Sequence, residues 1–383
     1  MPRTKLFILA TVSLGTLVGL TFGADAQSPP PRPASLQASE YSGTFKRADA
    51  DMRKVLETHQ GLNPKPIAGL SPEEARRQPS PADAVKALLK EQGKDPDALM
   101  AQMKVKKQDI TYSGPSGDMP ARIYTPENAG PGPLPVVVFF HGGGWVIADI
   151  DTYESSAMAL ARKANAIVVS VEYRRAPEHK FPAAHEDAVS AYSWVLKNAQ
   201  SFGGDPTRVA VAGESAGGNL AINVAMTMRD GQGQQPAHML LIYPVAGTNM
   251  QTPSYRENAD AKPLNRAGMQ WFVRNATNGT SDLQDPKLDV VGKANLKDLP
   301  DATIITAEID PLQSEGRQLA DKLKAAGSKV TYQDYDGVTH EFFGMDAVVA
   351  DSDKAQDLAA RELRQAFSPR ATGSTRGESQ KKQ

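Results

Sequence analysis

The residues best suited to chemistry in this sequence surround a serine with a glycine two positions away on each side. The run is Gly213-Glu-Ser-Ala-Gly217, with Ser215 at its centre. The apolar run 208–212 precedes it, and a helical pattern follows with almost no gap. This order predicts a strand, a sharp turn and a helix, which together strain the serine backbone and lift its hydroxyl above a sheet. A single match to this pattern also arises by chance, so other features must support it.

A serine hydroxyl becomes a good nucleophile beside a base, and the base needs a carboxylate to orient it. With this organisation, both partners are expected after later strands, first the acid and then the histidine. Among the six histidines, only His340 follows the last expected strand, in a loop that contains Gly337. We therefore predict that His340 is the base; the alternative is an ordinary histidine of a surface loop.

Three carboxylates are candidates for the acid. Asp310 lies just past the apolar run 303–307, and Pro311 restricts the loop that follows. A carboxylate at this strand end faces the same edge of the sheet as the serine turn. We therefore predict Asp310 as the acid. Glu308 and Asp336 are the alternatives, although Glu308 could instead brace the loop and Asp336 suits a turn.

Three consecutive glycines follow the first long apolar run. Because they lack Cβ atoms, the main chain of Gly142-Gly-Gly144 can approach a ligand closely. We predict that the N–H groups of Gly143, Gly144 and Ala216 form an oxyanion hole, with Ala216 at a helix N-terminus. A phosphate-binding loop is the alternative, but no Lys-Ser or Lys-Thr pair follows the glycines. His141 is expected to hold the loop by hydrogen bonding.

The elements that must position these residues alternate between strands and helices. Apolar runs that lack alternation predict strands buried on both faces, at 135–140, 166–173, 208–212, 239–243 and 303–307, with a further strand at 330–335. Helical patterns fall at 153–165, 183–199, 216–229, 314–326 and 353–367, and an edge hairpin is expected near 110–125. The predicted fold class is α/β, with a mostly parallel, doubly wound sheet.

The chain divides into a large α/β domain and several flanking segments. The α/β domain spans 104–367, and an insertion at about 250–285 interrupts its rhythm. A helical segment, 46–103, precedes it, and we expect this segment and the insertion to form a helical cap. Residues 27–45 form a proline-rich linker, and 368–383 a disordered tail.

Composition excludes several classes of function. A formal net charge of −1 over 383 residues does not favour nucleic acid or a membrane surface as a partner. The absence of cysteine excludes disulfides, zinc thiolates and a cysteine nucleophile.

Residues 1–26 resemble a signal peptide with cleavage near Ala26, so we expect a protein exported to the periplasm or secreted. A retained membrane anchor is the alternative, but the apolar run is short for a span.

Several motifs resemble those of the hormone-sensitive-lipase-like carboxylesterases, the bacterial family IV type of the α/β-hydrolase superfamily. They are His141-Gly-Gly-Gly144, Tyr173-Arg-Arg-Ala-Pro-Glu-His179, Phe181-Pro-Ala-Ala184, Gly213-Glu-Ser-Ala-Gly-Gly-Asn219 and Asp310-Pro-Leu312. The resemblance runs from about residue 70 to residue 367. It implies the α/β-hydrolase fold, a triad of Ser215, Asp310 and His340, and no cofactor or metal.

The chain departs from the family pattern at three positions. Glu214 stands where aspartate is frequent, Arg175 where an aliphatic residue is usual, and Glu341 where glycine is usual. Glu341 adjoins the predicted base, so it could alter the pKa of that base and the local contacts with substrate.

The predicted function is hydrolysis of short- to medium-chain acyl esters through an acyl-enzyme, with a small-molecule ester as substrate. An amidase, a lactonase or a carbohydrate deacetylase would use the same three residues. A non-catalytic binding protein is the alternative from another class, because a fold does not fix a function.

Overall fold

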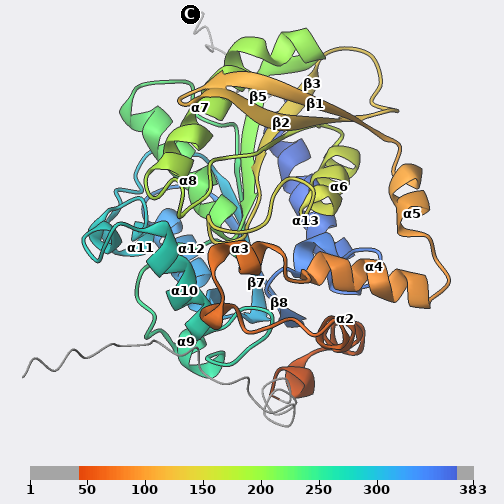
Figure 1. Cartoon of the computed structure of the whole chain (residues 1–383). Helices are drawn as coiled ribbons and strands as arrows, with labels where there is room; N and C mark the ends of the chain where they lie inside the picture. The colour runs from red at the N-terminus through yellow and green to blue at the C-terminus, as the bar shows by residue number, and fades with distance from the viewer. Residues whose placement is uncertain (1–42, 369–383) are drawn as a thin grey trace, which may run out of the picture.

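The computed structural model describes residues 43–368, and its centre is a twisted sheet of eight strands (Figure 1). The predicted signal peptide, most of the linker 27–45 and the tail beyond Ser368 lie outside the described residues, and those interpretations stay predictions. Residues 43–47 are helical. The last three residues of the predicted linker therefore belong to a helix.

The strands lie in the order β1-β2-β4-β3-β5-β6-β7-β8. They are β1 (Val105–Gly114), β2 (Gly117–Pro126), β3 (Leu134–Phe140), β4 (Ile167–Val171), β5 (Gly204–Glu214), β6 (Met239–Ile242), β7 (Ala302–Ile309) and β8 (Val330–Thr339). Strand β2 pairs antiparallel with β1 and β4, and all other pairs are parallel. The mostly parallel sheet predicted from the sequence is confirmed.

The central strands are apolar throughout because helices cover both faces of the sheet. In β3, Val136, Val138 and Phe140 face one core, whereas Val137 and Phe139 face the other, and all five are fully buried. Burying a side chain of this size stabilises the fold by about 1.5–3 kcal/mol. The run therefore lacks the polar alternation of a half-exposed strand.

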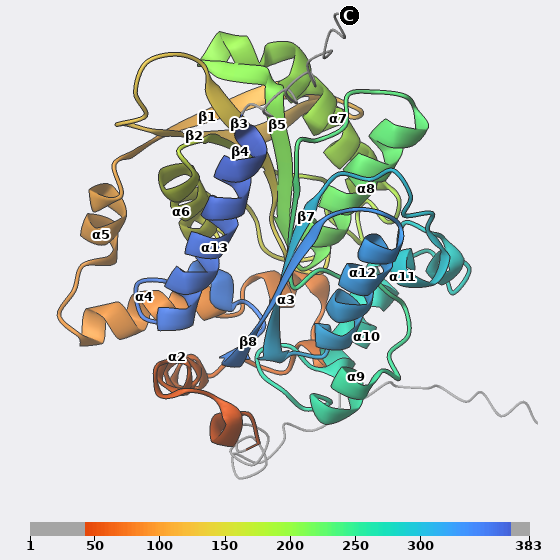
Figure 2. The ribbon, with the colours of Figure 1, turned by 180° about the vertical axis from the view of Figure 1, so that it is seen from behind.

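Figures 1 and 2 show α6 and α13 on one side of the sheet and α7, α8 and α12 on the other. These helices are α6 (Glu154–Ala164), α7 (Ala183–Asn198), α8 (Ala216–Asp230), α12 (Gln313–Ala325) and α13 (Ala350–Phe367). Each of the five overlaps a helical pattern predicted from the sequence. No helix in the described range, 43–368, is long and apolar enough to cross a membrane.

Two further groups of helices flank this core. The N-terminal group is α2 (Ala50–Gly61), α3 (Pro72–Arg76), α4 (Pro81–Glu91) and α5 (Pro96–Gln102). The insertion holds α9 (Pro253–Glu257) and α10 (Arg266–Ala276), and α11 (Val290–Lys293) follows it. Helix α3 begins with a capping box in which Ser71 and Glu74 satisfy each other's backbone N–H groups.

Helix α10 joins the two groups. It buries Met269, Trp271 and Phe272 on one face, and the Trp271 indole donates a hydrogen bond of 2.8 Å to the carbonyl of Leu70. The segment before α3 and the insertion thus pack together (Figure 1).

Candidate active site

Ser215 lies at the sharp turn between β5 and α8. Its backbone has φ 56° and ψ −118°, a strained conformation for a residue with a side chain. Its N–H donates to the carbonyl of Ile242 at 2.9 Å. A Cβ atom on Gly217 would lie 1.9 Å from the carbonyl oxygen of Phe140. The turn therefore brings chain against chain and requires glycine at this position.

The structure places Ser215, His340 and Asp310 in one hydrogen-bonded row. The Nε2 atom of His340 lies 3.0 Å from the Ser215 Oγ, and its Nδ1 lies 2.6 Å from the Asp310 Oδ2. The N–H of Leu312 donates to the second carboxylate oxygen of Asp310, at 2.8 Å. Because the three residues follow β5, β7 and β8, parallel strands bring their ends to the same edge of the sheet.

The two alternative acids lie elsewhere. Glu308 accepts a hydrogen bond of 2.8 Å from the N–H of Gly337 and pairs with Arg47 at 3.1 Å. It braces the end of β8 that leads to His340, as the sequence allowed. Asp336 is exposed on β8. Only Asp310, among the three candidates, contacts the imidazole.

The carboxylates around His340 determine its proton affinity. Burial disfavours the imidazolium and lowers its pKa, but the nearby carboxylates, Asp310 first and Glu341 after it, outweigh this effect. The pKa of His340 is therefore raised above its usual value. A raised pKa strengthens the histidine as a base once it is neutral.

The glycine loop lies against the turn that holds Ser215, because a Cβ atom on Gly142 would lie 3.3 Å from the carbonyl oxygen of Glu214. Gly143 and Gly144 have positive φ values of 91° and 59°, and a Cβ atom at Gly144 would lie 2.2 Å from the ring of Phe272. Within the described chain, the N–H groups of Gly143, Gly144 and Ala216 donate to no protein acceptor. These groups can therefore donate hydrogen bonds to a ligand oxygen without breaking an existing hydrogen bond.

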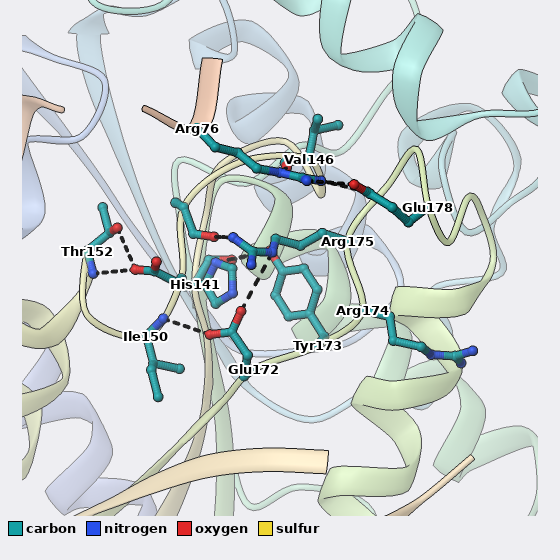
Figure 3. Close-up of polar contacts among 12 residues, drawn as sticks. Arg76, His141, Val146, Ile150, Thr152, Glu172, Tyr173, Arg174, Arg175 and Glu178 are labelled. Atoms are coloured by element: carbon teal, nitrogen blue, oxygen red, sulfur yellow. Dashed lines mark hydrogen bonds and ion pairs between the residues drawn. The ribbon is translucent and has the colours of Figure 1, made fainter. Parts of the chain in front are cut away.

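Aromatic packing holds the start of this loop (Figure 3). The Tyr173 hydroxyl donates to the carbonyl of His141 at 2.9 Å, and the two rings stack 4.2 Å apart. Burial lowers the pKa of His141 to about 4, so its ring is neutral at physiological pH. This arrangement supports a structural role for His141.

Two arginines hold the outer side of the loop (Figure 3). Arg175 donates to the carbonyl of Ala148 at 2.6 Å. Arg76, at the end of α3, donates to the carbonyls of Val146 and Ala176, each at 2.8 Å, and pairs with Glu178. The N–H of Val146 in turn donates to the carbonyl of Gly143. Arg76 thus ties the N-terminal segment to the turn that presents Gly143 and Gly144.

Known proteins match most of this chain. A family described as the α/β hydrolase fold matches residues 137–344. Carboxylesterase NlhH of Mycobacterium tuberculosis is 39% identical over 282 residues, which is 72% of this chain and 86% of that protein. The chain belongs to the hormone-sensitive-lipase-like carboxylesterases. The resemblance seen in its motifs is confirmed, and the protein is a carboxylic ester hydrolase.

Two other comparisons extend this result. The ethyl acetate hydrolase of Pseudomonas putida is 29% identical over 304 residues, 78% of this chain and 92% of that protein. The solved esterase of Pyrobaculum calidifontis has a TM-score of 0.70 and 33% identity, and the match covers 80% of this chain and 97% of that one. The α/β-hydrolase fold of this carboxylesterase is therefore shown by sequence and by structure.

Sequence reasoning missed several neighbours of the predicted triad in this hydrolase. The Tyr243 ring lies 4.5 Å from that of His340, and its hydroxyl donates to the buried Glu214. The Tyr153 hydroxyl donates to Glu341 at 2.7 Å. Tyr243 ends a strand predicted from the sequence, so its place at the same sheet edge as the site could have been predicted. No local sequence pattern marks Tyr153.

Burial raises the pKa of Glu214 to about 8, with Glu341 as the next cause. The Glu214 carboxyl is therefore largely protonated at neutral pH, and it adds little charge there.

Across residues 43–368, no three side chains form a cluster that could hold a metal ion.

Proposed function

We infer that this carboxylesterase cleaves short- to medium-chain acyl esters through an acyl-enzyme formed on Ser215. The observation that carries the proposal is the row in which His340 contacts the Ser215 hydroxyl on one side and the Asp310 carboxylate on the other. Such a row can remove the hydroxyl proton and stabilise the imidazolium that forms.

In the proposed mechanism, His340 takes the proton of Ser215 as its oxygen attacks the ester carbonyl. The oxygen of the tetrahedral intermediate accepts hydrogen bonds from the N–H groups of Gly143, Gly144 and Ala216. His340 then protonates the departing alcohol. Water, activated by the same histidine, hydrolyses the acyl-enzyme and restores the serine.

Two observations support small acyl groups. Ser215 is 5% exposed and His340 3% exposed, while Phe272 of α10 packs directly against Gly144. Space beside the glycine loop is thus limited by a side chain of the insertion. The related Pseudomonas putida enzyme is named for ethyl acetate, an ester with a two-carbon acyl group.

The test is turnover of p-nitrophenyl esters from acetate to palmitate by the wild type and by Ser215→Ala. We expect activity to peak at short or medium chains and to be nearly abolished by the substitution. Higher rates on emulsified long-chain triglyceride than on soluble esters would refute the chain-length proposal. Substantial activity in Ser215→Ala would refute the mechanism.

A further inference from the structure

Glu341 places a carboxylate beside the nitrogen that faces the nucleophile. Its Oε1 lies 3.8 Å from the Nε2 of His340, the same atom that lies 3.0 Å from the Ser215 Oγ. The Tyr153 hydroxyl donates to this oxygen at 2.7 Å and fixes its position. The backbone of Glu341 has φ 75°, a conformation that glycine adopts more readily.

Among the residues that the structure describes, no lysine or arginine lies within ion-pair distance of the Glu341 carboxylate, and its one ionic partner among them is His340. A second carboxyl group, that of Glu214, is 1% exposed, and its Oε1 has no hydrogen-bond partner in the described chain. Asp310 is the third carboxyl group beside this imidazole, and because burial raises the pKa of Glu214 to about 8, Asp310 and Glu341 carry most of the negative charge. The site therefore has an excess of acidic groups.

The Glu341 side chain also reaches accessible space. It is 22% exposed, whereas His340 is 3% exposed. In the proposed mechanism, the departing oxygen must come within about 3 Å of the His340 Nε2 to receive its proton. A charged substituent two carbons further along the alcohol would then lie within several ångströms of the Glu341 carboxylate, where water screens charges poorly.

We propose that Glu341 makes the active site favour esters with a cationic or neutral alcohol portion over those with an anionic one. The inference rests on the proposed function, because it requires the leaving group to depart past His340. It adds a property that the triad alone lacks, since the three triad residues do not discriminate between leaving groups by charge.

Three thioesters with the same acetyl group and two-carbon spacing test the proposal. They are acetylthiocholine, the neutral 3,3-dimethylbutyl thioacetate, and the anionic S-acetyl-2-mercaptoethanesulfonate. Because the chain contains no cysteine, a thiol-reactive chromophore detects the released thiol alone. Burial raises the pKa of Glu341, so kcat/KM is measured at about pH 8, above the usual range of a carboxyl group.

We expect the wild type to hydrolyse the cationic ester at least about tenfold better than the anionic one, which corresponds to about 1.4 kcal/mol. Glu341→Gln should reduce this ratio about tenfold, and kcat/KM for the neutral ester serves as the reference for both charged esters in each variant. Glu341→Gly removes the carboxylate with a residue suited to the backbone, and should give the same result if glutamine disturbs folding. Asp336→Asn is the matched control, because it removes an exposed carboxylate of β8 that does not contact His340, and it should leave the ratio unchanged.

Equal ratios in the wild type and both Glu341 variants would overturn the inference, while continued turnover of the neutral ester would leave the proposed function intact. A fall of the ratio in Asp336→Asn as large as in Glu341→Gln would also overturn it, because general charge would then explain the preference. If the wild type hydrolyses none of the three and a fluorophosphonate does not label Ser215, the proposed function fails, and the inference with it.

Discussion

Replacing Arg76 by alanine should slow catalysis although Arg76 lies outside the triad. Its guanidinium donates to the carbonyls of Val146 and Ala176, on the outer side of the turn that presents Gly143 and Gly144. Without these bonds, the turn is free to shift away from Ser215. The N–H groups proposed to hold the oxyanion would then be misplaced in the transition state.

The expected magnitude follows from the two bonds that are lost. A hydrogen bond to a charged donor contributes about 1.5–3 kcal/mol, and Arg76 is only 23% exposed. With values from the lower half of this range, the two bonds together contribute about 3–4.5 kcal/mol. Its ion pair with Glu178 adds at most about 1 kcal/mol, because Glu178 is 55% exposed. Loss of one oxyanion donor lowers kcat about 10²–10³-fold. A partly displaced turn should therefore lower kcat by about 100-fold.

The assay compares kcat and KM on p-nitrophenyl butyrate, together with the thermal midpoint, for three variants. Arg76→Ala should lower kcat far more than it raises KM. Arg76→Lys keeps the charge but not the planar donor fork, and should be intermediate. Glu178→Gln keeps both carbonyl bonds and should stay within about threefold of the wild type.

Two results would refute this reasoning. A folded Arg76→Ala variant with unchanged kcat would show that the turn keeps its position without the arginine. A loss in Glu178→Gln equal to that in Arg76→Ala would show that the ion pair matters, and not the bonds to the carbonyls.

Three further predictions concern the site and its surroundings. Glu341→Gln removes one of the carboxylates that raise the pKa of His340. Because the neutral histidine is the active form, the acid limb of the kcat/KM profile should move to lower pH. An acid limb at an unchanged pH would count against this coupling. Gly217→Ala should destabilise the protein by about 1–3 kcal/mol or more in urea unfolding, because its Cβ atom would clash with the carbonyl of Phe140. Gly279→Ala is the control and should be nearly neutral, because nothing lies within 4 Å of its Cβ position. Equal effects of the two substitutions would contradict the close contact between Gly217 and Phe140. The Glu214 carboxyl loses its proton near pH 4.5 when unfolded but near pH 8 when folded, so its protonated form stabilises the fold at low pH, and this contribution is lost as the pH rises between these values. Glu214→Gln should therefore show a shallower fall in unfolding free energy over this range, and parallel pH curves for variant and wild type would refute it.

The parts of the site that the sequence predicted are those with a local signature. Ser215 is marked by glycines that the turn requires, and Asp310 and His340 follow strands recognisable from their apolar runs. Parallel strands then bring these ends together whatever lies between them in the sequence. Chemistry placed at strand ends is thus accessible to sequence reasoning.

The parts it could not predict depend on contacts between distant segments. Arg76 lies 70 residues before Val146, to which it donates, and an arginine at the end of a short helix has no distinctive pattern. Tyr153 and Glu341 are 188 residues apart. Strand β5 begins at Gly204, before the apolar run, because Leu134 pairs with Gly204 outside that run. Such pairings follow from the assembled sheet and not from local composition.

The central claim is that Ser215 is the nucleophile of an esterase. It is tested most directly by treating the protein with a fluorophosphonate, mapping the adduct by mass spectrometry, and following residual activity on p-nitrophenyl butyrate. The account predicts one adduct per chain on Ser215, loss of activity in proportion to labelling, and no adduct in Ser215→Ala. Full activity in a completely labelled protein, or an active Ser215→Ala variant, would contradict it.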